Sequence, residues 1–143
     1  MTCPALSFFS SSPEQTASIA RRLIPSLAPG TVLALVGPLG AGKTAFVKGL
    51  AAGLGIPTRQ VVSPTYTLIH EHVGRLSLFH ADLYRLAGPS ETVDLGLEGY
   101  AERGGILAVE WPERAAGLLP SDTVNVRFEI LGVRERRITI ERP

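Results

Sequence analysis

The chain has 143 residues, of which 45% are hydrophobic and 19% are charged. This length is enough to bury one hydrophobic core, so we expect a single domain over residues 1–143. The composition excludes an intrinsically disordered protein, and a net charge of +1 excludes attraction to nucleic acid through overall charge alone.

The sequence carries no signal for export or for membrane insertion. No apolar stretch approaches the roughly 18 residues of a membrane span, and the N-terminal part lacks a basic start followed by an apolar run. Cys3 is the only cysteine, which excludes a disulfide within the chain and is compatible with a reducing compartment. We therefore expect a cytoplasmic protein that does not contact membranes.

A helix is the first predicted element. Ser12 is a favourable N-cap, Pro13 suits the first helical position, and Gln15 can complete a capping box. Pro25 has no amide hydrogen and crowds the preceding turn, so it should end or kink this helix. Residues 31–36 then form a short, almost wholly apolar run, which is typical of a parallel strand covered on both faces.

The rest of the chain alternates between predicted helices and strands. A helical stripe of apolar residues follows a glycine-rich turn and ends at Gly55. Residues 90–103 are also predicted to be helical, with breaks at Gly96 and Gly99. The predicted strands are residues 66–73 and 75–80, joined at Gly74, then 106–109, and finally 123–131 and 136–142, which form a hairpin around Gly132.

The glycine-rich turn at residues 37–44 matches the P-loop pattern G-x-x-x-x-G-K-[ST] at every fixed position, between a predicted strand and a predicted helix. Its glycines let main-chain N–H groups turn towards an anion. Lys43 should bridge the β- and γ-phosphates of a nucleotide, while the Thr44 hydroxyl should ligate Mg²⁺. An ordinary turn with a solvated Lys43 would not need both flanking elements. The predicted nucleotide-binding residues of this segment are Gly37, Leu39, Gly40, Ala41, Gly42, Lys43, Thr44 and Ala45.

The motif and the order of the elements predict an α/β fold of the P-loop NTPase type. We expect a three-layer sandwich in which a parallel core sheet lies between helices and carries antiparallel additions, including the C-terminal hairpin. The motif predicts nucleotide binding, but it does not by itself select hydrolysis, phosphoryl transfer or a regulatory role.

Two carboxylates could complete the site. P-loop enzymes need an acidic residue at the C-terminal end of a neighbouring strand to hold the metal or its water shell. Asp82 and Glu110 both follow predicted strands and should emerge at the ligand-binding edge of the sheet, although each could instead be a solvated cap of the next segment. Which of them holds the metal and which orients the attacking water stays open. The predicted catalytic residues are Lys43, Asp82 and Glu110, and the predicted metal ligands are Thr44, Asp82 and Glu110.

Three further residues are candidates for contact with the nucleotide. Ser63 and Thr65 lie in a loop of the kind that supplies a hydroxyl to the γ-phosphate in P-loop proteins, although Ser-Pro-Thr is equally an ordinary turn. Trp111 follows Glu110, and core packing is its default role. Pro112, however, forces a bend that could present the Trp111 ring to a ligand or partner.

Histidine and arginine clusters have simpler interpretations. No other metal-ligating residues lie at a suitable spacing from His70, His72 and His80. We therefore expect these histidines to be hydrogen-bonded or exposed and not part of a metal site. Three arginines between residues 134 and 137 should form a solvated face near the hairpin turn. A docking patch for RNA or protein is the alternative interpretation of these arginines.

Four segments taken together resemble the TsaE (YjeE) family of bacterial ATPases, which is required for threonylcarbamoyladenosine modification of tRNA. They are GPLGAGKTAF at residues 37–46, VSPTYTLIHEH at 62–72, FHADLYRL at 79–86 and GILAVEWPER at 105–114. The match runs from about Ser12 through the last hairpin, and the combination is far more specific than the P-loop alone. Pro38 and Ala45 depart from the family, which usually has an acidic residue and a second threonine there.

The resemblance implies ATP at 37–44, Mg²⁺ near Thr44, Asp82 and Glu110, a switch-like segment at 63–67, and a place for Trp111 in the active region. Family members act with TsaB and TsaD, the pair that transfers the threonylcarbamoyl group to an adenosine of tRNA. The resemblance therefore implies an ATPase that supports this complex, with tRNA contacted through the partners. Since the sequence shows no obvious arginine finger, which is worth roughly 10³–10⁵ in rate, we expect slow hydrolysis until a partner stimulates it.

Three other functions are compatible with a P-loop. A small-molecule kinase normally adds a mobile lid with arginines and an acceptor pocket, for which 143 residues leave little chain. A signalling GTPase reads guanine with N-K-x-D, whereas the only asparagine here, Asn125, begins Asn-Val-Arg-Phe. A nucleotide-dependent docking module would bind ATP without releasing phosphate.

Overall fold

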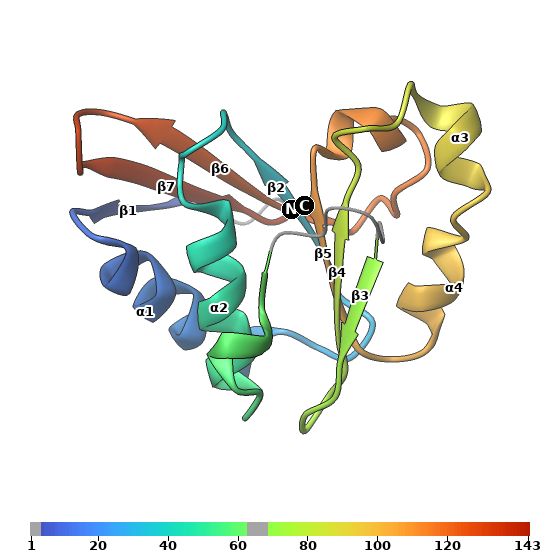
Figure 1. Cartoon of the computed structure of the whole chain (residues 1–143), viewed down its shortest axis with the longest axis horizontal. Helices are drawn as coiled ribbons and strands as arrows, with labels where there is room; N and C mark the ends of the chain where they lie inside the picture. Colours follow the sequence, from blue (N-terminus) through green and yellow to red (C-terminus); the bar gives the residue numbers. More distant parts are fainter. Residues whose placement is uncertain (1–3, 63–68) are drawn as a thin grey trace.

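One seven-stranded sheet forms the centre of the molecule, and helices lie on both of its sides (Figure 1). The computed structural model describes residues 4–62 and 69–143. Within these residues the strands are β1 (Leu6–Ser10), β2 (Val32–Val36), β3 (Ile69–His72), β4 (Leu78–Asp82), β5 (Ile106–Glu110), β6 (Val124–Ile130) and β7 (Arg136–Glu141). The helices are α1 (Pro13–Leu23), α2 (Lys43–Gly53), α3 (Pro89–Val93) and α4 (Leu97–Glu102).

The middle of the sheet is parallel. The strand order is β1-β7-β6-β2-β5-β4-β3, and β6, β2, β5 and β4 all run in the same direction. Leu33 and Leu35 of β2 are fully buried in the core beneath α1 and α2, while Val32 packs in the opposite core with Leu107 of β5. Burial on both faces explains why β2 is an almost continuous apolar run, as predicted.

Antiparallel strands extend the sheet at both edges. β3 pairs with β4, β7 pairs with β6, and β1 pairs with β7. The predicted α/β fold, with a parallel core and a C-terminal hairpin, is therefore confirmed. Sequence analysis does not predict β1, because this edge strand is short, four of its five residues are exposed, and LSFFS has no regular alternation.

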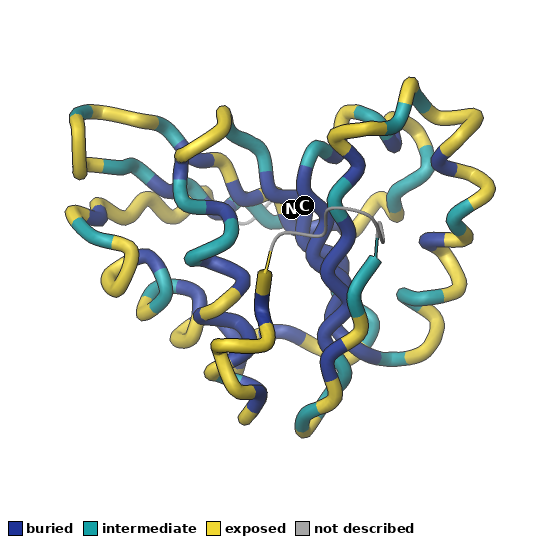
Figure 2. Tube along the Cα trace, viewed as in Figure 1, coloured by how far each residue is buried: buried dark blue, intermediate teal, exposed yellow. Residues whose placement is uncertain are grey.

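Helices cover the two faces of the sheet in separate places (Figure 1, Figure 2). α1 and α2 pack on one face, where the larger hydrophobic core contains Phe46, Leu50 and Phe128. α3 and α4 lie on the other face, where a smaller core gathers Phe79 and Leu97. Among the helices of the described residues, none is long and apolar enough to span a membrane.

The helix termini follow most of the predicted signals. Ser12 caps α1 by accepting a hydrogen bond from the Gln15 N–H at 3.1 Å, but the Gln15 side chain accepts from the residue before Ser12, so the predicted capping box is displaced. Pro25 lies in a 3₁₀ turn that ends α1, as expected. Gly96, with a φ of 67°, separates α3 from α4. The predicted break at Gly99 is wrong, because α4 accommodates this glycine within its span.

The strand predicted at 75–80 begins later than expected, at Leu78, and continues to Asp82. The physical reason is a contact between the preceding turn and the end of α2, where the Arg75 N–H donates to the Leu54 carbonyl oxygen at 3.0 Å. A Cβ on Gly74 would come within 2.5 Å of the same oxygen, so this turn requires glycine. The first residues of the strand predicted at 66–73 lie outside the described residues.

Gly49 allows α1 and α2 to touch, because a Cβ at this position would overlap the main-chain oxygen of Ala17. We expect Gly49→Ala to lower the free energy of unfolding by about 1–3 kcal/mol through overpacking. Gly99→Ala is the matched control, since Gly99 is also helical but has open space around it. The control should raise stability by up to about 1 kcal/mol. Urea denaturation measures both, and equal effects would contradict the close approach of the two helices.

Candidate functional site

The P-loop at residues 37–44 connects the end of β2 to the start of α2, as predicted. Gly40 and Gly42 have φ angles of 79° and 104°, which residues with a side chain rarely adopt. A Cβ on Gly37 would come within 2.8 Å of the Phe128 Cβ, so this position also needs glycine. Because α2 begins directly after Gly42, its free N–H groups and the positive end of its dipole lie at the loop.

Lys43 is buried in the first turn of α2, with only 5% of its surface exposed. Its ammonium donates a hydrogen bond to the Gly37 carbonyl oxygen at 2.7 Å and lies 3.9 Å from the centroid of the Trp111 ring. Burial lowers the pKa of Lys43, and the negative charges of Glu110 and Asp82 partly oppose this effect. A largely desolvated cation is therefore held directly beside the P-loop.

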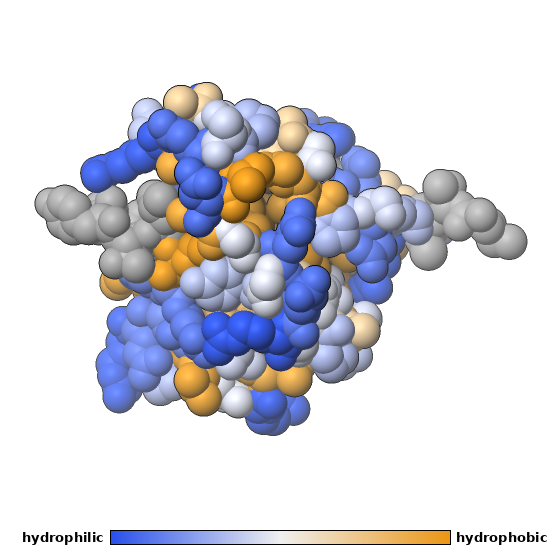
Figure 3. Space-filling model, turned by 90° about the vertical axis from the view of Figure 1, so that its right-hand side faces the viewer, coloured by the Kyte–Doolittle hydropathy of each residue, from blue (hydrophilic) through white to orange (hydrophobic). Residues whose placement is uncertain are grey.

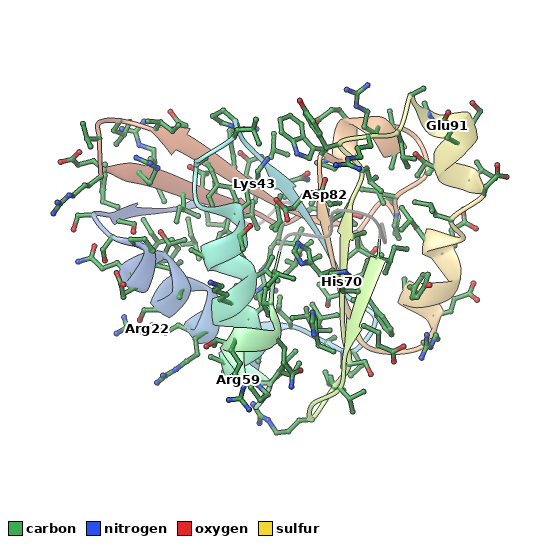
Figure 4. All side chains as sticks on the ribbon, viewed as in Figure 1. Arg22, Lys43, Arg59, His70, Asp82 and Glu91 are labelled. Carbon is green, nitrogen blue, oxygen red and sulfur yellow. The ribbon has the colours of Figure 1, made fainter. Side chains whose placement is uncertain are left out.

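Asp82 and Glu110 end the adjacent parallel strands β4 and β5, and their Cα atoms are directly paired. As expected, the structure brings them together at one edge of the sheet, and both act electrostatically on Lys43. Figure 4 shows Lys43 and Asp82 at neighbouring ends of α2 and β4. Glu110 is buried, whereas Asp82 is half-buried and accepts a hydrogen bond from the Tyr84 N–H at 3.0 Å. Burial raises the pKa of the Asp82 carboxyl above its usual range.

Glu110 has a direct partner, His80, that was not expected from the sequence. His80 Nε2 lies 2.5 Å from Glu110 Oε2, and the His80 side chain is fully buried in β4. The other ring nitrogen, Nδ1, has no hydrogen-bond partner within residues 4–62 and 69–143. One signal points to His80 in the sequence. It precedes Asp82 by two residues on a strand, so both side chains lie on the same face of the sheet.

Trp111 occupies an unusual backbone position immediately after β5. Its φ is 58°, the only positive φ of a non-glycine residue in the described part of the chain, and Pro112 begins a 3₁₀ turn directly afterwards. This bend places the ring against the Lys43 ammonium and the Tyr84 ring, whose centroid is 5.0 Å away. The interpretation of Trp111 as a residue of the active region therefore has geometric support. Left-handed backbone costs about 1–2 kcal/mol, which the fold must offset elsewhere.

The C-terminal hairpin contributes an arginine to the P-loop. Arg136 Nη2 donates a hydrogen bond to the Gly40 carbonyl oxygen at 3.1 Å, across 96 residues of sequence. Arg134 is exposed, as expected for a solvated arginine face, and Arg137 forms a surface ion pair with Glu129 at 3.5 Å. Arg136 is half-buried and is also hydrogen-bonded to the P-loop. A cavity of about 420 Å³, which we call the hairpin cavity, is lined by Ser11, Ser12, Thr16, Gly40, Gly42, Arg134 and Arg136.

The other predicted loop ligands differ in their surroundings. Ala41 is fully buried, Ala45 is partly buried, and Leu39 is exposed on the loop. Main-chain groups of these residues are therefore better placed than their side chains to meet a phosphate. The predicted ligands Ser63 and Thr65 lie outside the described residues.

The predicted metal ligands offer oxygen atoms, which Mg²⁺ prefers. Thr44 lies in the first turn of α2, close in sequence to Lys43, and the two carboxylates approach from β4 and β5. In the described part of the chain, no three His, Cys, Asp or Glu side chains converge on one point. These residues therefore suit a magnesium ion that completes its coordination with phosphate oxygens and water, as is usual in nucleotide sites.

Replacing Asp82 with Asn tests whether its charge destabilises the fold. Because burial raises the Asp82 pKa, the folded state holds the proton more tightly than the unfolded state, and this group costs stability as pH rises from below 3.8 to above the raised pKa. Asp82→Asn keeps the oxygen that accepts from the Tyr84 N–H but removes the charge. It should therefore raise the thermal midpoint at neutral pH and have little effect below the ordinary Asp pKa.

Differential scanning calorimetry at both pH values measures this difference. Asp122→Asn is the control, since Asp122 is exposed and should leave the midpoint unchanged. A lower midpoint for Asp82→Asn at neutral pH would show that the carboxylate stabilises the folded state.

A family model and curated relatives of the chain all point to the same family. A family model described as "Threonylcarbamoyl adenosine biosynthesis protein TsaE" matches residues 10–138. A "tRNA threonylcarbamoyladenosine biosynthesis protein TsaE" from Treponema pallidum is 45% identical over 114 residues, which is 80% of this chain and 84% of that protein. The protein of the same name from Bacillus subtilis is 46% identical over 128 residues, or 89% of this chain and 79% of that protein.

A comparison with solved structures also finds a protein of the same fold. The crystal structure of Bacillus subtilis YdiB superposes with a TM-score of 0.81 and 36% sequence identity, covering 99% of this chain and 87% of that one. The region matched by the family model contains the P-loop, both strand-end carboxylates and Trp111. The resemblance seen in four sequence segments is thereby confirmed, and the chain belongs to the TsaE family of tRNA threonylcarbamoyladenosine biosynthesis proteins.

Proposed function

We propose that the chain is an ATPase that binds and hydrolyses Mg-ATP and thereby supports a TsaB–TsaD complex in threonylcarbamoyladenosine modification of tRNA. The observation that carries this proposal is the buried Lys43, which donates to a P-loop carbonyl and interacts electrostatically with two strand-end carboxylates. Phosphoryl transfer needs this combination, in which a cation meets the phosphates and acidic groups hold the metal and the attacking water.

The triphosphate of ATP would lie along the P-loop. Its oxygens would accept hydrogen bonds from the loop amides, from the start of α2 and from Lys43, whose ammonium would leave the Gly37 carbonyl. The nucleoside would extend into the hairpin cavity, beside Arg136. The cavity volume of about 420 Å³ is within the range of small-molecule sites.

Hydrolysis would use the two carboxylates in different roles. Mg²⁺, when bound, neutralises phosphate charge, and Thr44 with one carboxylate would hold it directly or through water. The other carboxylate would orient the water that attacks the γ-phosphate. Lys43 would stabilise the charge that spreads over the γ-phosphate oxygens, and its burial strengthens that interaction because little water screens it.

Exposed apolar side chains near the site favour the proposal that it contacts a partner protein. Tyr84 is 50% exposed and Val133 is 93% exposed, at positions beside Trp111 and on the hairpin cavity. Figure 3 shows the side of the molecule that carries α3 and α4. Further apolar surface is exposed there, mainly in the upper half of the view. Exposed apolar surface of this kind is common at protein–protein contacts. We propose TsaB and TsaD homologues as the partners, with tRNA contacted only through them.

Lys43→Ala tests the site directly. Removing the ammonium should lower ATP turnover by about 100-fold or more, or abolish nucleotide binding, because Lys43 supplies the buried positive charge that would meet the phosphates. The fold should survive, since Lys43 donates to the loop and is not a core side chain. Lys48→Ala is the control on the exposed face of α2 and should behave like the native chain. Unchanged affinity and turnover in Lys43→Ala would reject this site.

Partner dependence is tested by measuring phosphate release from ATP with the chain alone and with TsaB and TsaD counterparts from the same organism. We expect slow release alone and a clear increase in the mixture, up to the roughly 10³–10⁵ that an arginine supplied by a partner can contribute. Equal rates would contradict partner stimulation. ATP binding without phosphate release in either sample would identify a docking module instead.

A further inference from the structure

The contact between His80 and Glu110 is the least explained polar interaction in the site. His80 Nε2 and Glu110 Oε2 are 2.5 Å apart, His80 is completely buried, and only 6% of the Glu110 side chain is exposed. Replacing a buried ion pair with apolar residues of similar volume is often neutral or stabilising, so stability alone does not explain why this pair is present. A role in function would explain why the pair is present.

The sheet register explains how this contact forms. In the parallel pair of β4 and β5, Asp82 lies opposite Glu110 and His80 lies opposite Ala108. Alternate residues share a face, so His80 and Asp82 point to the same side of the sheet as Glu110. The imidazole therefore lies one step deeper than the Asp82 carboxylate and reaches Glu110 diagonally, from the interior of the protein.

The proton in this contact can be assigned from the partners. A carboxylate only accepts hydrogen bonds, so Nε2 carries the proton and donates it to Glu110. Nδ1 has no partner in residues 4–62 and 69–143, and a second N–H there would be buried without an acceptor. This N–H therefore fixes the direction of the Glu110 carboxylate, which acts electrostatically on Lys43.

We propose that His80 is a positioning residue, which holds Glu110 Oε2 so that Oε1 faces the water that attacks the phosphate. This inference rests on the proposed ATPase function, and it assigns Glu110 as the water-orienting carboxylate. Asp82 is fixed differently, by the main-chain N–H of Tyr84, and remains for the metal and its water shell. Each carboxylate thus has its own support, and groups that orient a reacting ligand typically contribute about 10- to 100-fold to activity.

Two variants of similar size separate positioning from packing. His80→Met fills the space without a donor, while His80→Gln supplies an N–H at a comparable reach. We expect His80→Met to lower kcat by about 10- to 100-fold with little change in Mg-ATP affinity, and His80→Gln to recover most of the loss. His72→Met is the control, because His72 is buried on the neighbouring strand β3 and makes no contact with Glu110 within the described residues.

The pattern of kinetic constants decides the proposal. Equal losses in His80→Met and His80→Gln would show that the ring only packs, and native kcat in His80→Met would overturn the positioning role. Thermal midpoints of all three variants show whether a loss comes from unfolding. If the native chain itself releases no phosphate, the proposed function fails, and the role of His80 in hydrolysis fails with it.

A spectroscopic measurement tests the contact without turnover. A long-range proton–nitrogen correlation spectrum of the native chain should show His80 protonated at Nε2, with slow exchange of that proton. Glu110→Gln should accelerate the exchange, because a neutral amide oxygen is a weaker acceptor than a carboxylate. Protonation at Nδ1 alone, or exchange that does not respond to Glu110→Gln, would overturn the proposal even if ATP hydrolysis is established.

Discussion

The burial of one ammonium group beside the P-loop is the constraint on which the site depends. Lys43 has lost most of its water, and the Gly37 carbonyl, the Trp111 ring and two carboxylates partly replace it. These partners compensate a charge that would otherwise be costly to bury. In the proposed function a triphosphate would be a stronger partner, since it carries several negative oxygens. On that proposal, the fold holds Lys43 in place before the nucleotide binds.

The topology of the sheet places this cation. β2 leads into the P-loop at the centre of the sheet. The neighbouring strand β5 ends at Glu110, and β4, one strand further out, ends at Asp82. Because these strands are parallel, their C-terminal ends open at the same edge. The antiparallel hairpin of β6 and β7 then folds back so that Arg136 meets Gly40. The proposed phosphate and nucleoside regions thus come from different parts of the sheet.

The site residues that could be predicted are those with a local signature. The P-loop has fixed spacing, and Asp82 and Glu110 end apolar strands, so pattern and strand geometry are enough to bring them together. Arg136 lacks such a signature, because its role comes from a contact across 96 residues. His80 has only its two-residue spacing from Asp82, and strand register brings it to Glu110. The edge strand β1 could not be predicted for a similar reason. Its own residues have no strand pattern, and pairing with the distant strand β7 makes it a strand.

The proposed function requires that this loop, with Lys43, binds a magnesium-bound triphosphate. Equilibrium dialysis of ATP against the native chain, with magnesium present, measures this most directly. We expect saturable retention of a single ATP per chain, which weakens when magnesium is chelated. Retention of no ATP at any concentration, by the chain alone or beside its proposed partners, would contradict it.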